Sequence, residues 1–276
     1  ELLARGHEVT VLTRQQSPDS IPGTTYVTGL QDLSRAYDAV INLAGASLAA
    51  SRWSDSYKAE IRASRIVFTQ ELGAHLKAQD THPGIWLNAS AIGYYGASES
   101  KVFDESDSAG VGFSADLCRD WEQAARDVAG DARLCVMRLG VVLDASGGAF
   151  EEMARSFRLG VGSWMGDGEQ WLSWIHRADV ISAIAFLLES DKAHGEFNLT
   201  APAAISNRAF AKALAGHMRT FVSLPVPAPM MRLLVGEMAD ELLLSGQNVA
   251  PKALLDAGFE FRHPTIDDAL RAILSR

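Results

Sequence analysis

Arg14 directly follows the segment His7–Thr13, which is rich in apolar and β-branched residues. At the end of the second strand of a dinucleotide-binding sheet, an acidic residue binds the ribose 2′-hydroxyl of NAD, whereas an arginine accommodates the 2′-phosphate of NADP. The guanidinium suits phosphate because it is always charged and presents a planar fork of donors. Thr13 and Arg14 therefore indicate NADP. A solvated arginine after a strand is an equally weighted alternative.

A turn of small residues, Asn42-Leu-Ala-Gly45, ends a second apolar run. Ala and Gly there would let a flat cofactor ring lie against the backbone, although a tight turn without a ligand fits the tetrapeptide equally well. No Gly-x-Gly-x-x-Gly motif occurs in the chain. The phosphate-binding loop, if there is one, is expected upstream of Glu1.

Short apolar runs alternate with long amphipathic ones in the first half of the chain. Strands are predicted at 39–44, 85–89 and 134–138, and helices at 55–77 and 113–128. Strands separated by helices of this length indicate a parallel sheet built from right-handed crossovers. The fold class is therefore α/β, a Rossmann-like doubly wound parallel sheet. Residues 1–6 resemble the last turns of a helix, so a strand, a turn and half a helix are expected before Glu1.

The pattern changes near residue 150. Helices at 150–159, 178–189 and 207–216 are interleaved with glycine-rich loops, and Pro225–Pro229 separates a final, mostly helical portion. We predict an NADP-binding domain over residues 1–150 and a smaller, mostly helical region over residues 151–276. Because ligands bind at the carboxyl ends of such strands, the smaller region is predicted to face the substrate.

Composition narrows the class of protein. The 276 residues carry a formal charge of −9, which argues against nucleic acid as a partner. No run approaches the roughly 18 apolar residues of a membrane span. Two cysteines make no disulfide framework, and no basic-then-apolar leader is present, so a cytoplasmic location is expected. No metal site is predicted, because His176 lacks partners at ligand spacing.

Several motifs occur together in the order seen in a known family. They are the strand before Thr13-Arg14, the Asn42–Gly45 turn, Ser90-Ala-Ile-Gly-Tyr-Tyr-Gly96, Arg138–Leu143 and Trp174–Asp179. In this order the chain resembles the extended short-chain dehydrogenase/reductases. The similarity is closest to their atypical NAD(P)-dependent epimerase/dehydratase-like subgroup, sometimes described as cell-division-inhibitor-like. The tail Pro251–Phe261 resembles the short C-terminal module of that subgroup.

The resemblance implies a set of cofactor contacts. Thr13 and Arg14 would contact the 2′-phosphate of NADP(H), with the other contacts from Leu43 and Ala44 in the adenine and ribose groove, Glu60 and Arg65 on the long helix, and Val142 near the nicotinamide. From spacing alone, a solvated salt bridge between Glu60 and Arg65 is the alternative.

The catalytic signature of the family is missing. Ordinary members carry a Tyr and a Lys four residues apart on the helix predicted at 113–128, where this chain has Phe113 and Leu117. Ser90, Tyr94 and Tyr95 are the candidate substitutes, since each offers a hydroxyl near the expected site. The run to Tyr-Gly is one residue longer than usual, so Ala91 is the other candidate for the serine position. Either tyrosine is also explained by packing.

On the substrate side, the candidates are Arg138, Gln170 and Trp171. Arg138 could meet an anionic group, with burial in an ion pair as the alternative. Gln170 offers amide hydrogen bonds and Trp171 a stacking plane on a glycine-rich loop. His176 is predicted to be a hydrogen-bonded structural residue, and Asp179 to cap the helix after it.

The resulting prediction is an NADP(H)-binding oxidoreductase of the short-chain dehydrogenase/reductase type. Its small-molecule substrate would be a carbonyl or hydroxyl compound, or one like a sugar nucleotide. A sugar-nucleotide epimerase or dehydratase is one alternative. A catalytically inactive NADP(H)-sensing regulatory protein is another, suggested by the missing Tyr/Lys pair. A homodimer is expected only by analogy with the fold.

Overall fold

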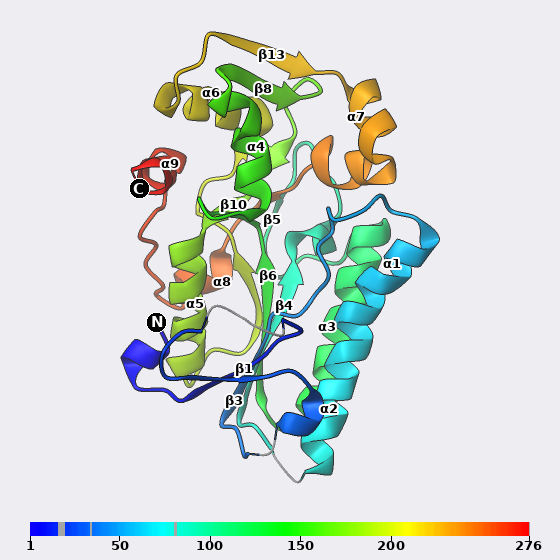
Figure 1. Ribbon diagram of the computed structural model, residues 1–276, viewed down its shortest axis with the longest axis vertical. Helices are drawn as coiled ribbons and strands as arrows, with labels where there is room; N and C mark the ends of the chain where they lie inside the picture. Colours follow the sequence, from blue (N-terminus) through cyan, green and yellow to red (C-terminus); the bar gives the residue numbers. More distant parts are fainter. Residues whose placement is uncertain (16–19, 34, 80–81, 276) are drawn as a thin grey trace.

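A four-stranded parallel sheet lies at the centre of the computed structural model, which describes residues 1–15, 20–33, 35–79 and 82–275 (Figure 1). The strand order is β11-β6-β4-β3, with every pair parallel; the strands are β3 (Ala39–Asn42), β4 (Ile85–Ala91), β6 (Arg133–Leu139) and β11 (Gly195–Leu199). The central strands β4 and β6 are buried along most of their length, as parallel strands covered on both faces must be.

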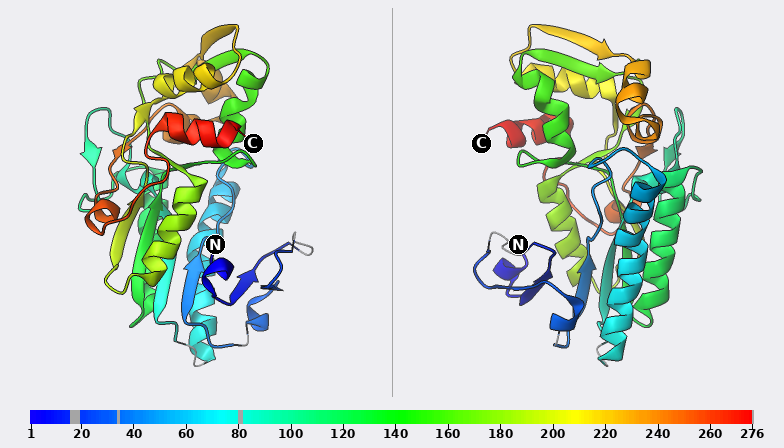
Figure 2. Two further views of the ribbon diagram at one scale, coloured as in Figure 1. Left: turned by 90° about the vertical axis from the view of Figure 1, so that its left-hand side faces the viewer. Right: turned by 45° about the vertical axis from the view of Figure 1, so that its right-hand side comes forward.

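Helices cover both faces of this sheet (Figures 1 and 2). One face packs against α2 (Phe68–Ala78) and α3 (Phe113–Ala129), and the other against α5 (Arg177–Glu189) and α8 (Lys252–Asp256). Trp86 of β4 belongs to the cluster with Leu72 and Leu76 of α2, whereas its neighbour Leu87 belongs to the cluster with Ala183 and Leu187 of α5. The alternation of strand side chains thus builds two cores, and the predicted doubly wound α/β fold is confirmed.

A continuous helical segment leads from β3 to β4, as the pattern over 55–77 predicts. It consists of α1 (Asp55–Arg62), one π-helical stretch η3 (Ala63–Val67) and α2. Ser54 caps its start by accepting the backbone N–H of Tyr57 at 3.2 Å. The π-helical stretch contains Arg65, and such stretches recur at functional sites.

The first strands form a separate parallel pair, β1 (Val9–Leu12) with β2 (Thr24–Val27). Both pack on the α2 side, since Leu12 and Val27 join the cluster around Leu72 and Trp86. The short helix before β1, η1 (Leu3–Arg5), ends at Gly6 with φ 85°, the left-handed stop expected there.

The later part of the chain forms a second layer above the carboxyl ends of the strands (Figure 1). Its main elements are α4 (Gly148–Arg158), β8 (Val161–Met165), α6 (Asn207–His217), β13 (Val222–Val226), α7 (Ala228–Val235) and α9 (Ile266–Leu274). The prediction of helices and loops missed a strand pair here. Pro225, interpreted as punctuation, lies in β13 opposite Trp164 of β8, and a strand with one free edge tolerates its missing N–H.

The shorter elements connect these layers. They are η2 (Leu30–Asp32), η4 (Ile92–Tyr95), β5 (Val102–Phe103), β7 (Val141–Leu143), β9 (Trp171–Leu172), β10 (Trp174–His176), β12 (Ile205–Ser206), η5 (Ala239–Leu243) and β14 (Asn248–Val249). Among the described residues, no helix is both long and apolar enough to cross a bilayer.

The start of α5 corrects one prediction. His176, not Asp179, is its N-cap, with Nδ1 accepting the N–H of Ala178 at 3.0 Å, so the structural role predicted for His176 is confirmed. Asp179 is fully buried and accepts the backbone N–H groups of Arg262 and His263 at 2.7 and 3.0 Å. Its carboxylate thereby holds the C-terminal segment against the start of α5.

Candidate active site

The turn after β3 is held in place by its own asparagine. Asn42 is buried and donates through Nδ2 to Thr69 at 2.9 Å and to Asn88 of the neighbouring strand at 2.8 Å. Its side-chain oxygen accepts the backbone N–H of Ala44 at 3.2 Å. These bonds fix the backbone of Leu43 and Ala44 at the carboxyl edge of the sheet, where ligands bind in this fold.

Arg65 lies directly against this turn. A Cβ atom added to Gly45 would come within 2.8 Å of the Arg65 Cζ atom, so a larger residue there would displace the guanidinium from this position. Arg65 forms no ion pair with a described residue, and its hydrogen bonds to the Ile61 carbonyl and Ser64 Oγ are long, at 3.3 and 3.4 Å. Burial lowers the pKa of Arg65 from its ordinary value.

A partly buried cation without a counter-ion is unfavourable in an empty site. An anionic ligand at the turn would supply the missing charge, and a dinucleotide phosphate has the required chemistry. The arrangement of Arg65 against Gly45 therefore fits a dinucleotide cofactor at this edge.

The other residues predicted to contact a cofactor lie around this edge or beyond it. Arg14 is exposed directly after β1 and has no ion-pair partner in the part of the chain that the structure describes. Thr13 Oγ1 accepts the N–H of Gln15 at 3.2 Å. Leu43 is 55% exposed at the carboxyl edge of the sheet. Glu60 is exposed on α1, and Val142 is half-buried in β7.

Ser90 and Arg138 belong to a buried network below this edge. Arg138 makes two bonds to the Glu122 carboxylate, Nε to Oε1 at 2.8 Å and Nη2 to Oε2 at 2.9 Å. Ser90 donates to the same carboxylate at 2.8 Å. All three residues are at most 2% exposed, so this is an ion pair closed off from solvent and the alternative considered for Arg138 is what the structure contains.

The two tyrosines lie differently. Tyr95 is 2% exposed; its hydroxyl donates to Asn198 at 2.7 Å and accepts from Arg138 at 3.0 Å. Burial raises the pKa of Tyr95 to about 12. Tyr94 is half-buried, its ring lies 3.6 Å from the Arg138 guanidinium, and its hydroxyl makes no hydrogen bond to another described residue.

Phe113 and Leu117 occupy the α3 positions that carry Tyr and Lys in ordinary short-chain dehydrogenase/reductases, and both pack among apolar side chains. Phe113 meets Trp53 edge-on at 5.0 Å between ring centroids, and the Lys58 ammonium lies 5.0 Å from its ring. Leu117 is 4% exposed in a cluster with Met238. This surface therefore packs against the C-terminal segment, and neither side chain can transfer a proton.

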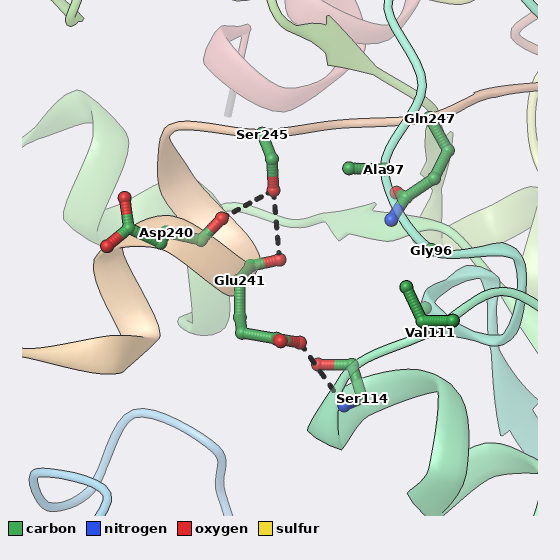
Figure 3. A pocket seen from close by; sticks show the side chains of 9 residues that line it. Gly96, Ala97, Val111, Ser114, Asp240, Glu241, Ser245 and Gln247 are labelled. Atoms are coloured by element: carbon green, nitrogen blue, oxygen red, sulfur yellow. Dashed lines mark hydrogen bonds between the residues drawn. The ribbon is translucent and has the colours of Figure 1, made fainter.

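A cavity of about 110 Å³ lies at the start of α3, where Ser114 is part of its lining (Figure 3). It is lined by Gly93, Gly96, Ala97, Val111, Ser114, Asp240, Glu241, Ser245 and Gln247. The Glu241 side chain and Ser114 point toward each other across it, and Glu241 Oε2 accepts the Ser114 backbone N–H at 3.2 Å. The Ser114 hydroxyl is buried, and no other described residue hydrogen-bonds to it.

Ser114 and Glu241 are functional candidates that the sequence did not reveal. They lie 127 positions apart, and neither is part of a motif with characteristic spacing. The one available signal in the sequence was the lack of a capping side chain, since α3 begins after Gly112. A carboxylate from elsewhere in the chain could have been expected there.

Gln170 and Trp171 adjoin the C-terminal side of this cavity. Gln170 donates through Nε2 to the carbonyls of Leu243 and Met165 at 2.8 and 3.1 Å, and its Oε1 is buried without a partner. Trp171 donates to the Glu99 carbonyl at 2.8 Å, and its backbone lies against Gly246. The structure thus brings both residues to the segment that supplies Glu241 and Gln247.

The parallel sheet, the asparagine-fixed turn and an arginine with no counter-ion among the described residues together define a dinucleotide-binding protein of the Rossmann type. Comparison with known proteins makes this more specific. Residues 1–200 match the model of the NAD dependent epimerase/dehydratase family, and residues 226–273 match a domain of unknown function, DUF1731. The chain belongs to the NAD dependent epimerase/dehydratase family, and the resemblance inferred from its motifs is confirmed.

Individual relatives agree with this assignment. The chain is 42% identical over 234 residues to the epimerase family protein Mb2239 of Mycobacterium bovis, covering 84% of this chain and 77% of the relative. It is 33% identical to human epimerase family protein SDR39U1, covering 99% and 94%. A crystal structure of human SDR39U1 (isoform2) with NADPH superposes with a TM-score of 0.90 at 32% identity, covering 100% of this chain and 93% of that one.

Proposed function

We propose that this protein binds NADP(H) and transfers hydride to or from a small carbonyl or hydroxyl substrate. The observation that carries the cofactor assignment is the Arg65 guanidinium, which lies against Gly45 and makes no ion pair with a described residue. The exposed Arg14 after β1 favours the phosphorylated cofactor, because an acidic residue there would repel a 2′-phosphate. The similar human protein crystallised with NADPH supports the same choice.

In this proposal, residues 1–150 bind the cofactor, with the 2′-phosphate at Thr13 and Arg14. Leu43 and Ala44 cover the adenosine, and Arg65 balances phosphate charge; Glu60 and Val142 complete the predicted set. When bound, the nicotinamide supplies the hydride chemistry. The protein's own residues orient the substrate and move its proton.

Tyr94 is the residue that its surroundings favour for transferring the substrate proton. Its hydroxyl makes no hydrogen bond to another described residue, and the Arg138 guanidinium, 3.6 Å from the ring, holds the ring in place. The Tyr95 hydroxyl donates to Asn198, and the Ser90 hydroxyl donates to Glu122. Because both hydroxyls are bonded inside the protein, we assign these residues to holding Arg138 and the loop after β4 in place. Residues 151–276, including Gln170 and Trp171, face the substrate.

A second candidate function is regulation by NADP(H) without turnover. It is favoured by Phe113 and Leu117, whose apolar contacts replace the usual proton-transferring pair. The two candidates differ in whether NADPH is oxidised when carbonyl compounds are added. A sugar-nucleotide epimerase would keep its cofactor bound through turnover and release no reduced product.

A paired titration tests the cofactor assignment. NADPH and NADH are titrated by nicotinamide fluorescence into the wild-type protein and the Arg14→Ala variant. We expect NADPH to bind at least about tenfold more tightly than NADH, a difference of about 1.4 kcal/mol, and the variant to lose this preference. Arg155→Ala, which removes an exposed arginine of α4, is the control and should change neither affinity. Equal or absent binding of both cofactors to the wild type would contradict the proposal.

A further inference from the structure

The C-terminal module, residues 226–273, supplies much of the wall of the cavity at the start of α3. Asp240, Glu241, Ser245 and Gln247 come from the module, and the remaining lining residues come from the loops after β4 and the start of α3. The apolar contacts of Met238 with Leu117 and Trp53 hold the module against α3. The cavity therefore exists only because the module is docked.

Within this wall, one carboxylate is directed inward and the other outward. The Asp240 carboxylate pairs with Arg232 at 2.9 Å on the exposed side of η5. Glu241 points toward the first turn of α3, where it accepts only the Ser114 N–H among described residues and makes no ion pair. Figure 3 shows the two side chains leaving η5 in different directions.

The polar groups around Glu241 are incompletely bonded. The Ser114 hydroxyl is buried with no hydrogen-bond partner among the described residues, although a buried hydroxyl normally has one. A cavity of about 110 Å³ is ample for several water-sized groups, since one water needs roughly 10–15 Å³. Of its lining carboxylates only Glu241 faces the cavity, and the lining includes neither lysine nor arginine. An anionic group would therefore be repelled, while a hydroxyl could donate to Glu241 and bond to Ser114.

We propose that Glu241, supplied by the C-terminal module, is a substrate-contacting residue that selects an uncharged, hydroxyl-bearing group in this cavity. The proposal deepens the oxidoreductase function by specifying which end of a substrate enters here. It also gives the module a role, since the cavity between the module and α3 becomes the substrate subsite. Glu241 accepts the hydroxyl hydrogen, and Ser114 completes the contact.

The alternative explanation is that Glu241 serves only as a cap for α3. Glu241→Gln distinguishes the two roles, because the amide oxygen still accepts the Ser114 N–H while the charge is lost. Glu237→Gln is the matched control: this carboxylate belongs to the same module but pairs with Lys58 at 2.5 Å and does not line the cavity.

The probes are glucose and glucuronate, two rings of similar size that differ in a carboxylate. Saturation-transfer NMR titrations use the full chain without nicotinamide cofactor, so their result is independent of whether NADPH binds. We expect glucose to bind at least tenfold more tightly than glucuronate. Glu241→Gln should weaken glucose binding about fivefold to tenfold, since a bond to a charged acceptor is replaced by a neutral one.

The control variant should bind glucose as the wild type does, and both variants should keep the wild-type melting temperature within a few degrees. The proposal is overturned if glucuronate binds as well as glucose, or if Glu241→Gln leaves the glucose affinity unchanged. It is also overturned if no glucose signal appears when the protein concentration is 100-fold lower than that of glucose. A failed NADPH titration alongside these expected results would remove the cofactor assignment and leave this subsite standing.

Discussion

Two groups of polar residues near the carboxyl edge of the sheet differ in how fully they are bonded. In the buried network, Glu122, Arg138, Ser90 and Tyr95 satisfy one another at 2.8 to 3.0 Å. Nearer the edge, Arg65 has no counter-ion and the Ser114 hydroxyl has no hydrogen-bond partner among the residues that the structure describes. A completed network stabilises the fold, whereas polar groups left incomplete at a cavity or turn indicate where a ligand belongs.

The largest effect is expected from removing the charge at the centre of the buried network. Glu122→Ala leaves Arg138 buried without a counter-ion, which should lower the free energy of unfolding by about 3 to 5 kcal/mol in urea denaturation. Glu152→Ala removes an exposed carboxylate outside the network that pairs with Arg155 at 2.6 Å, and it should cost no more than about 1 kcal/mol. Similar losses from both variants would show that the network is not the stabilising element.

Raising the pH should weaken the same network through Tyr95. Its pKa is raised from 10 to about 12 in the folded protein, so the fold favours the neutral phenol. The stabilisation is complete below pH 10 and is lost as the pH rises from 10 through 12, by about 2 to 3 kcal/mol. The difference in unfolding free energy between wild type and Tyr95→Phe should shrink over this range. A difference that is constant from pH 9 to 12 would mean that Tyr95 titrates normally.

Two serine substitutions compare the bonded and unbonded groups directly. Ser90→Ala removes a bond to the Glu122 carboxylate and should cost about 1.5 to 3 kcal/mol. Ser114→Ala removes a buried hydroxyl with no partner, so the unfolding free energy should change by less than about 0.5 kcal/mol. Equal costs for both serines would indicate that Ser114 is bonded in the folded protein and would remove the distinction between the two groups.

Much of the fold was predictable because it follows from local periodicity. The strands around Ile41, Leu87 and Val136 and the helix beginning at Phe113 were expected from apolar runs and crossovers, and the structure has them at nearly the same bounds. The β8–β13 pair was not expected, because Pro225 and Gly162 are residue types that strands disfavour and because the pairing is non-local. Propensity carries no information about a partner about 60 residues away.

The candidate site was predictable only where one short segment carries it. The Asn42–Gly45 turn and the absence of a tyrosine at Phe113 can be seen directly in the sequence. The contacts of Glu241 with Ser114 and of Arg138 with Glu122 depend on which side chains the folded chain brings together. For Ser90 in particular, the sequence showed a hydroxyl near the site, but only the structure shows that it points to Glu122.

The most direct test of the contrast between bonded and unbonded groups is a double measurement on Arg65→Gln, recording its unfolding free energy and its affinity for NADPH. Arg65 lies half-buried without a counter-ion, so removing its charge should leave stability unchanged or slightly increased while NADPH binding weakens at least about tenfold. A variant that loses stability and keeps its NADPH affinity would contradict the account, because Arg65 would then support the fold rather than a ligand.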